Sequence, residues 1–231
     1  MNLKFNNSAI IKRLMPGQPC ILCGTFSDNG VWCESCDADL PRLGKAHCPV
    51  CGLPTLNGDI CGKCLKHAPS FDSTLSSFAY AFPIDKLVQA IKFSGRIALV
   101  NQLADTLSSR IVTHPDYIIA MPLHPMRLRE RGFNQSQLIA QRLVKSLGVS
   151  LLTDVCKRTR NTTPQSSLPW QERGKNMRNA FTCVADLSGK HIAIVDDVMT
   201  TGTTIEELAR TLREKGAIKV SAWVLARTLP H

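Results

Sequence analysis

The chain has 231 residues, of which 44% are hydrophobic, and it carries 28 Lys and Arg against 18 Asp and Glu. This apolar fraction excludes an intrinsically disordered chain, and the composition excludes collagen-like and coiled-coil proteins. No stretch approaches the roughly 20 apolar residues that span a bilayer, and residues 1–15 lack the long apolar core of a signal peptide. We therefore expect a soluble, cytoplasmic protein with one large or two small domains.

The formal net charge of +10 is unevenly distributed. Residues 121–190 contain 12 Lys and Arg against 4 Asp and Glu, so this stretch holds most of the excess. A solvated surface is one explanation. The clustering of the charge favours a site for polyphosphate or nucleic acid.

Eight of the ten cysteines form four Cys-x-x-Cys pairs, and the pairs form an internal repeat. In each half the second Cys is followed by Gly (Gly24, Gly52), and an Asn-Gly hairpin signal recurs at the same offset (Asn29-Gly30, Asn57-Gly58). Four thiolates joined in this way are typical of a zinc ribbon. We predict two structural zinc sites, with the ligands Cys20, Cys23, Cys33, Cys36, Cys48, Cys51, Cys61 and Cys64.

Three alternatives bear on this zinc prediction. Redox-active dithiols would require a thioredoxin-like βαβ pattern, which the sequence lacks. The ligands could pair across the two ribbons, and His67 could replace a thiolate, although we expect His67 to be a bystander. Such small units cannot bury a core, so zinc should supply most of their folding free energy. The two remaining cysteines, Cys156 and Cys183, are predicted to be buried structural thiols.

The chain after the ribbons reads as one α/β domain that follows a polar stretch at residues 67–77, for which no strand is predicted. Apolar residues at helical spacing predict helices over 84–91 and 97–111, with an interruption near Ser94-Gly95. Strands are then predicted at 117–123, 149–155, 191–195 and 218–226, and helices at 134–147 and 203–215. This alternation predicts a mostly parallel, doubly wound sheet, in which ligands bind outside the carboxyl ends of the strands.

The carboxyl end of the strand predicted at 191–195 carries the sequence Asp196-Asp197-Val198-Met199-Thr200-Thr201-Gly202-Thr203-Thr204. Hydroxyls and backbone N–H groups at the start of a helix form a cradle for an anion such as phosphate. The two acids could hold the vicinal hydroxyls of a sugar or, directly or through water, a magnesium ion. The alternative is an ordinary capped helix with Thr203 or Thr204 as the N-cap.

The segment IVDDVMTTGTT resembles the motif that binds phosphoribosyl pyrophosphate (PRPP) in type I phosphoribosyltransferases. Together with the ribbons, MPLHPMRLRERGFNQSQ (121–137) and QSSLPWQERGKNMRNAF (165–181) resemble the ComF family of competence and DNA-utilisation proteins, over essentially everything from Cys20 onward. The resemblance implies an N-terminal tail at 1–15, a double zinc ribbon at 16–70, and a phosphoribosyltransferase-like domain with a doubly wound, mostly parallel sheet at 71–231.

The resemblance also implies roles for individual residues. Asp196 and Asp197 would contact the ribose and serve as the catalytic residues if the protein turns over, and Thr200, Thr201, Gly202, Thr203 and Thr204 would enclose the 5-phosphate. The pyrophosphate loop would contain Leu123, Arg127, Arg131, Gly132 and Asn134, with Arg129 pointing away. The long connection 159–183 would be a mobile lid with Gln165, Arg173 and Asn176, unless it is a variable surface insertion. Mg²⁺ would accompany PRPP.

The function implied by the resemblance is support for the uptake or utilisation of extracellular DNA, with single-stranded DNA and the uptake machinery as partners and a peripheral position at the inner membrane. Two alternatives stay open. One is an active phosphoribosyltransferase that displaces pyrophosphate with a nucleobase or related acceptor, for which we find no acceptor-recognition motif. The other is a PRPP-sensing regulatory or adaptor protein. DNA binding by residues 121–190 would rest on phosphate contacts, because aromatic residues are sparse there (Phe133, Trp170).

Overall fold

The structure is a computed structural model, and it describes residues 18–27, 30–94, 96–160 and 179–230. The chain divides into two compact units, residues 1–40 and 41–231. The first ribbon forms the first unit. The second ribbon belongs to the same compact unit as the α/β sheet, a placement that becomes important for the site below.

The first unit is built on a short antiparallel pair, β1 (Gln18–Pro19) and β2 (Phe26–Ser27), followed by the one-turn helix α2 (Glu34–Ala38). Trp32 is its large buried side chain, with 3% of its surface exposed. The indole N–H of Trp32 donates a hydrogen bond of 2.7 Å to the carboxylate of Asp37, so the buried ring leaves no unpaired donor. Among the described residues of this unit, Leu40 and Cys20 are the other buried apolar side chains, a core too small for independent folding, which agrees with a unit held by metal.

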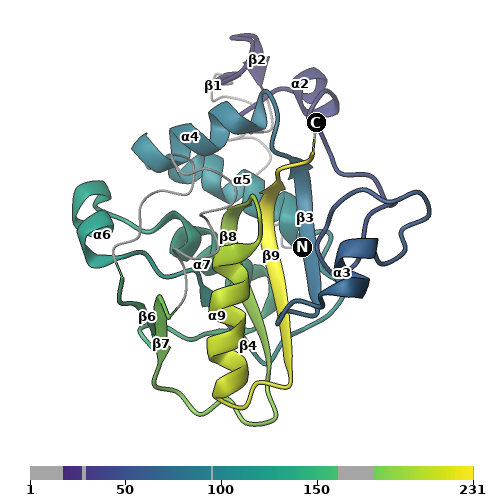
Figure 1. Ribbon diagram of the computed structural model, residues 1–231. Helices are drawn as coiled ribbons and strands as arrows, with labels where there is room; N and C mark the ends of the chain where they lie inside the picture. Colours follow the sequence, from purple (N-terminus) through teal and green to yellow (C-terminus); the bar gives the residue numbers. More distant parts are fainter. Residues whose placement is uncertain (1–17, 28–29, 95, 161–178, 231) are drawn as a thin grey trace, which may run out of the picture. The chain divides into compact units, whose positions relative to one another are not determined.

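The second unit contains a five-stranded sheet in the order β3-β9-β8-β4-β5, and every pairing within it is parallel (Figure 1). Its strands are β3 (Ser73–Ala79), β4 (Tyr117–Ala120), β5 (Ser150–Leu151), β8 (His191–Met199) and β9 (Lys219–Arg227). The central strands β8 and β9 are buried along most of their length, as expected for parallel strands covered on both faces. The predicted fold class is confirmed.

Helices cover both faces of this sheet (Figure 1). The helices α5 (Ile97–Ser108) and α7 (Gln135–Leu147) pack on one face, and α9 (Thr203–Glu214) packs on the other. The remaining helices are α3 (Gly62–Lys66), α4 (Ile84–Ser94) and α6 (Pro125–Arg131), and a small antiparallel pair is formed by β6 (Cys156–Arg158) and β7 (Phe181–Cys183). Cys156 and Cys183 face each other across this pair and are buried, as predicted.

Three strands of the sheet, β3, β4 and β5, differ from the expected elements. The polar stretch at 67–77 contains most of β3, which was missed because five of the seven residues from Ser73 to Ala79 are Ser, Thr or Ala. Parallel pairing with β9 buries Ser76 and Ser77 in spite of their polarity. The predicted strands at 117–123 and 149–155 are shorter than expected, because only 117–120 and 150–151 pair with a neighbour.

Candidate functional site

Two clusters of four cysteines satisfy the geometric requirements of zinc sites. Within each cluster the sulfur atoms all lie within 4.8 Å of one another, and the members are Cys20, Cys23, Cys33 and Cys36 in one and Cys48, Cys51, Cys61 and Cys64 in the other. The Sγ atoms of Cys23 and Cys33 are 3.7 Å apart, and those of Cys51 and Cys61 are 3.6 Å apart. A tetrahedral zinc with Zn–S bonds of about 2.3 Å places its sulfurs about 3.8 Å apart. The ligands therefore pair within each ribbon.

In both ribbons, backbone N–H groups donate hydrogen bonds to cysteine sulfurs and so favour the thiolate form. The amide of Leu22 donates to the sulfur of Cys20 at 3.4 Å, and the amide of Cys61 donates to the sulfur of Cys48 at the same distance. Burial alone would raise the pKa of Cys20, but the surrounding backbone donors outweigh it and lower the pKa to about 6. The same balance lowers the pKa of Cys48 to about 7. Hydrogen bonding with Thr25 lowers the pKa of Cys23 as well. Each cluster thus has at least one thiol whose pKa favours the thiolate that zinc requires.

The acid pair lies within β8, because the strand continues beyond its predicted end as far as Met199. The carboxylate of Asp196 accepts hydrogen bonds from the hydroxyl of Ser136, at 2.8 Å, and from the amide of Asp197, at 2.9 Å. Asp197 is 5% exposed and accepts from the amide of Val198 at 2.7 Å. Both side chains are therefore fixed before any ligand arrives.

A lysine that the sequence analysis missed completes this acid pair. The ammonium group of Lys92, on α4, lies 3.1 Å from the Oδ2 atom of Asp197. Burial would lower the pKa of Lys92, but the charge of Asp197 outweighs it and raises the pKa. Burial, together with the charge of Asp197, raises the pKa of Asp196 to about 7. The site therefore holds two carboxyl groups and one ammonium in a largely enclosed space.

The loop after β8 requires glycine at its turn. Gly202 is the N-cap of α9 and has a φ of +84°, in the left-handed region. A Cβ at this position would lie 2.6 Å from the Cε atom of Met199. The hydroxyls of Thr201 and Thr203 lie 2.7 Å apart above the first turn of the helix. We call residues 199–204 the phosphate loop, because the backbone amides and hydroxyls at a helix N-terminus suit an anion.

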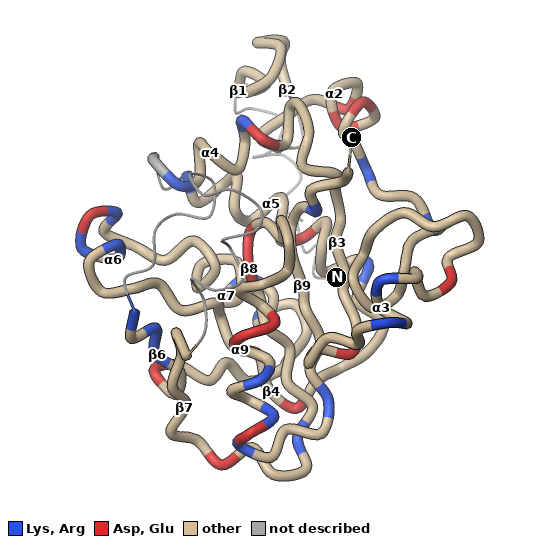
Figure 2. Tube along the Cα trace, in the orientation of Figure 1, with Lys and Arg blue, Asp and Glu red and all other residues tan. Residues whose placement is uncertain are grey.

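Cationic side chains from two helices line a cavity of about 200 Å³, whose lining residues are Lys92, Arg127, Glu130 and Arg131. The segment that carries the two arginines was expected to be a loop, but residues 125–131 form α6, so that expectation was wrong. Arg127 and Arg131 are one helical turn apart and therefore share a face. Arg129 is not among the described residues that line this cavity. Figure 2 shows the basic segments of α6 and β6 on one side of the sheet.

Comparison with known proteins gives a consistent result along the chain. The family model of the double zinc ribbon domain matches residues 10–65, and that of the phosphoribosyl transferase domain matches residues 129–229. The DNA utilization protein YhgH of Escherichia coli K12 is 37% identical over 91% of this chain and 97% of its own length. Competence protein F of Haemophilus influenzae is 32% identical over 87% of this chain and 92% of its own length. The chain belongs to the ComF family. Competence protein ComFC of Bacillus subtilis is 28% identical over 90% of this chain and 95% of its own length.

The structure describes the other predicted pyrophosphate-loop residues of this ComF-family chain but not the predicted lid residues. Asn134 caps α7 and donates to the carbonyl of Met121 at 3.0 Å, so it orders the segment between β4 and α7. Gly132 ends α6 with a φ of +79°. A second cavity, of about 620 Å³, lies beside this segment and is lined in part by Leu123, Asn134 and Arg158. The predicted lid residues Gln165, Arg173 and Asn176, and also Asn29, lie outside the described residues.

Two arginines of this ComF-family chain were not expected at the site. Burial lowers the pKa of Arg158, at the end of β6, and the charge of Asp196 acts against this effect from nearby. Arg227, at the end of β9, is 3% exposed and donates to the backbone of the phosphate loop. Neither arginine belongs to a recognisable motif. Each is the last residue of a strand, a position that gives no signal of a functional role in the sequence.

None of the helices in the described parts of the chain is long and apolar enough to cross a membrane.

Proposed function

We propose that this protein binds PRPP at the carboxyl edge of its sheet and acts in the utilisation of DNA taken up by the cell. The observation that carries the proposal is the order of groups along one edge. The acid pair on β8 leads directly into the phosphate loop, and the cavity lined by Lys92, Arg127 and Arg131 adds a cationic wall. These groups match the three polar parts of PRPP, which are its ribose hydroxyls, its 5-phosphate and its diphosphate.

Each group has a defined task in this proposal. The carboxylates of Asp196 and Asp197 accept hydrogen bonds from the ribose hydroxyls, and the amides and hydroxyls at the start of α9 hold the 5-phosphate. Arg127 and Arg131 bind diphosphate oxygens with their planar guanidinium groups. Mg²⁺, with Asp196 and Asp197 as its nearest protein ligands directly or through water, would neutralise charge on the diphosphate. The bond between Lys92 and Asp197 must open or rearrange when the ribose enters.

The biological role is proposed from the relatives and from charge. The proteins named DNA utilization protein YhgH and competence protein F match this chain over nearly their full lengths. The excess of Lys and Arg in residues 121–190 would attract the phosphates of single-stranded DNA as well as those of PRPP. We place this activity in the cytoplasm, in cooperation with the uptake machinery.

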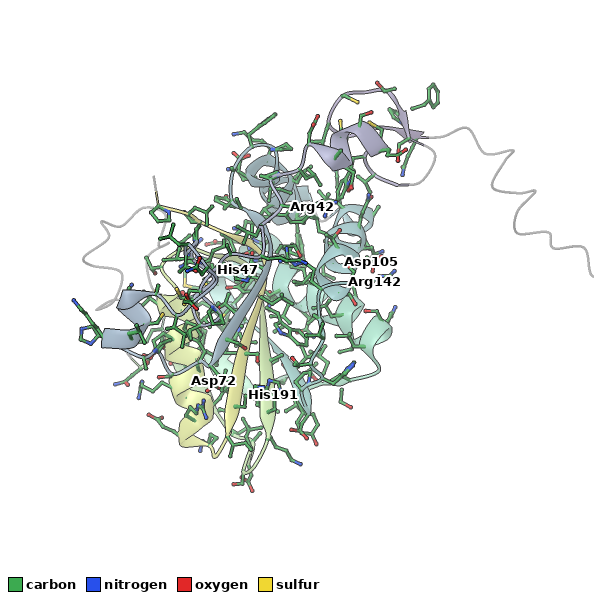
Figure 3. The ribbon with its side chains drawn as sticks, turned by 90° about the vertical axis from the view of Figure 1, so that its right-hand side faces the viewer. Arg42, His47, Asp72, Asp105, Arg142 and His191 are labelled. Atoms are coloured by element: carbon green, nitrogen blue, oxygen red, sulfur yellow. The ribbon has the colours of Figure 1, made fainter. Side chains whose placement is uncertain are left out.

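Calorimetric titration with PRPP and Mg²⁺ tests the ligand. Wild-type protein should bind, and the Asp196→Asn/Asp197→Asn double variant should lose at least about 2 kcal/mol of binding free energy, since two charge-assisted contacts are removed. The matched control is Asp105→Asn. Asp105 forms an exposed ion pair with Arg142 at 2.6 Å, and Figure 3 shows this pair on α5 and α7. If the wild type does not bind PRPP, the proposed function is refuted.

The same preparation separates a binding protein from an enzyme. In a transferase the nitrogen of the acceptor forms a bond to C1 of the ribose, the bond from C1 to the diphosphate oxygen breaks, and the acceptor nitrogen loses a proton. Pyrophosphate release should therefore be measured with a panel of nucleobases. Release above the rate of PRPP hydrolysis would identify an enzyme, and binding without release would identify a protein that uses PRPP as a signal.

A further inference from the structure

The second zinc ribbon is fixed to the phosphate loop by one buried arginine. The guanidinium of Arg227 donates from Nε to the carbonyl of Cys51, a predicted zinc ligand, at 2.9 Å. Its Nη1 group donates to the carbonyls of Met199 and Thr228, each at 2.9 Å, and also to the carbonyl of Thr200. One charged group thus holds the backbone of a metal-binding turn and the backbone of the phosphate loop together.

A second connection runs through Thr74 on β3. Its amide donates to the carbonyl of Pro49 at 2.9 Å, and its hydroxyl donates to the carbonyl of Val50 at 2.6 Å. The hydroxyl also lies 3.8 Å from the sulfur of Met199, the first residue of the phosphate loop. Both carbonyls belong to the turn between Cys48 and Cys51. The turn between these two metal ligands is therefore bonded directly to β3.

The ribbon approaches this surface closely at a glycine. Gly52 has a φ of +70°, and a Cβ placed there would lie 3.2 Å from the Cγ2 atom of Thr74 and 3.8 Å from the Cδ atom of Arg227. Farther out, a cavity of about 290 Å³ has walls from both parts, including Lys63 and His67 of the ribbon and Thr201 and Thr203 of the phosphate loop. The ribbon is thus one side of the space that adjoins the loop.

We propose that Arg227 is a positioning residue that makes the second zinc ribbon part of the phosphate site, so that zinc binding and ligand binding are thermodynamically linked. Zinc holds the turn from Cys48 to Cys51, and this turn supplies an acceptor for Arg227. When zinc leaves, a buried guanidinium loses that acceptor, and the carbonyls of the phosphate loop lose a fixed donor. Linkage is reciprocal, so a ligand that orders the loop must also retain zinc.

The ligand half of this inference rests on the proposed function, and the experiment separates the two. Zinc affinity is measured from the extent of zinc release to a chromogenic chelator at equilibrium, on the full chain carrying Cys23→Ser and Cys36→Ser, which leaves one intact site. The probe is ribose 5-phosphate, which carries the ribose and phosphate but no diphosphate that would itself bind zinc. We expect a saturating concentration to raise the affinity for zinc at least about fivefold, the lower end of common coupling energies.

The same background tests Arg227 without any ligand. Arg227→Met should weaken zinc binding about tenfold and remove the protection by ribose 5-phosphate, and Arg227→Lys should restore part of both. The matched control is Arg110→Met. Arg110 also donates to two backbone carbonyls, those of Leu43 and Ser77, at 3.2 Å each, but it does not contact the phosphate loop. Its loss should leave the protection by ribose 5-phosphate unchanged.

Three outcomes decide the inference. Equal release with and without ribose 5-phosphate, in protein that calorimetry shows to be loaded with it, would overturn the linkage. Unchanged release from a folded Arg227→Met variant would overturn the role of Arg227, and if that variant does not fold, Arg227→Lys replaces it in this test. Weaker zinc binding by the variant, with no calorimetric binding of ribose 5-phosphate or PRPP to the wild type, would support the contact between Arg227 and the ribbon and would reject only the proposed function.

Discussion

Replacing Asp196 with Asn should stabilise the protein at pH 8 relative to pH 5.5. Burial and the charge of Asp197 raise the pKa of Asp196 from 3.8 to about 7. Between these two values the folded chain retains a proton that the unfolded chain has released, so stability falls as pH rises through this window. The variant has no proton to release at this position, and its Oδ1 can still accept from the hydroxyl of Ser136.

The magnitude follows from the part of the window that lies above pH 5.5. From pH 5.5 to about pH 7 the loss is 1.36 kcal/mol for each pH unit, or about 2 kcal/mol in total. Above pH 7 the folded carboxyl is ionised as well, and the slope ends. The free energy of unfolding of Asp196→Asn minus that of the wild type should therefore increase by about 2 kcal/mol between pH 5.5 and pH 8.

Urea unfolding at both pH values measures this difference, with zinc-loaded protein throughout. Asp105→Asn serves as the control, because it makes the same replacement at an exposed surface ion pair. Equal effects of Asp196→Asn at pH 5.5 and pH 8 would refute the reasoning. A stabilised variant that no longer binds PRPP would show that the site is retained at a cost in stability.

Three further results are expected. Lys92→Met should weaken PRPP binding by about tenfold in calorimetry, because it removes a cation from the proposed diphosphate wall and leaves Asp197 buried without its ion pair. Gly202→Ala should lower the free energy of unfolding by at least about 1 kcal/mol and abolish PRPP binding, because a Cβ would lie 2.6 Å from a side-chain carbon at a φ of +84°. Arg127→Ala/Arg131→Ala should weaken single-stranded DNA binding and reduce its salt dependence by about 1 to 2 in logarithmic slope.

Each of these results has its own control. For Lys92, the variant Lys86→Met removes an exposed lysine from the same helix, and equal losses from both would contradict the proposal. For Gly202, Gly44→Ala has open space around the added carbon and should be neutral. For the arginine pair, unchanged DNA affinity at low salt would show that α6 does not contact DNA.

The sequence predicted those features whose chemistry depends on near neighbours in the chain. Cysteine spacing predicted two metal sites, because a knuckle closes within four residues. Which knuckles pair stayed open until the structure showed that they pair within each ribbon. The strands β8 and β9 were evident because both faces are buried, which produces continuous apolar runs. The acid pair was found because it follows such a run and precedes a glycine turn.

The features that were missed depend on contacts between distant segments. Strand β3 has the composition of a loop, and only its pairing with β9 explains its burial. Lys92 lies on an amphipathic helix, where a lysine ordinarily faces solvent, and its partner is 105 positions away in the chain. The helix α6 did have local signals in the sequence, Pro125 at its start and Gly132 at its end. These signals were outweighed by the expectation, drawn from the family resemblance, that the segment is a pyrophosphate loop.

The position of β9 has a consequence for folding on the ribosome. This strand is made after every other described strand, yet it lies between β3 and β8 and is the partner of both. Until it emerges, β3 and β8 each present an unpaired edge, and unpaired edges favour association with other chains. Nascent or truncated chains that end before residue 219 should therefore depend on chaperones and aggregate without them.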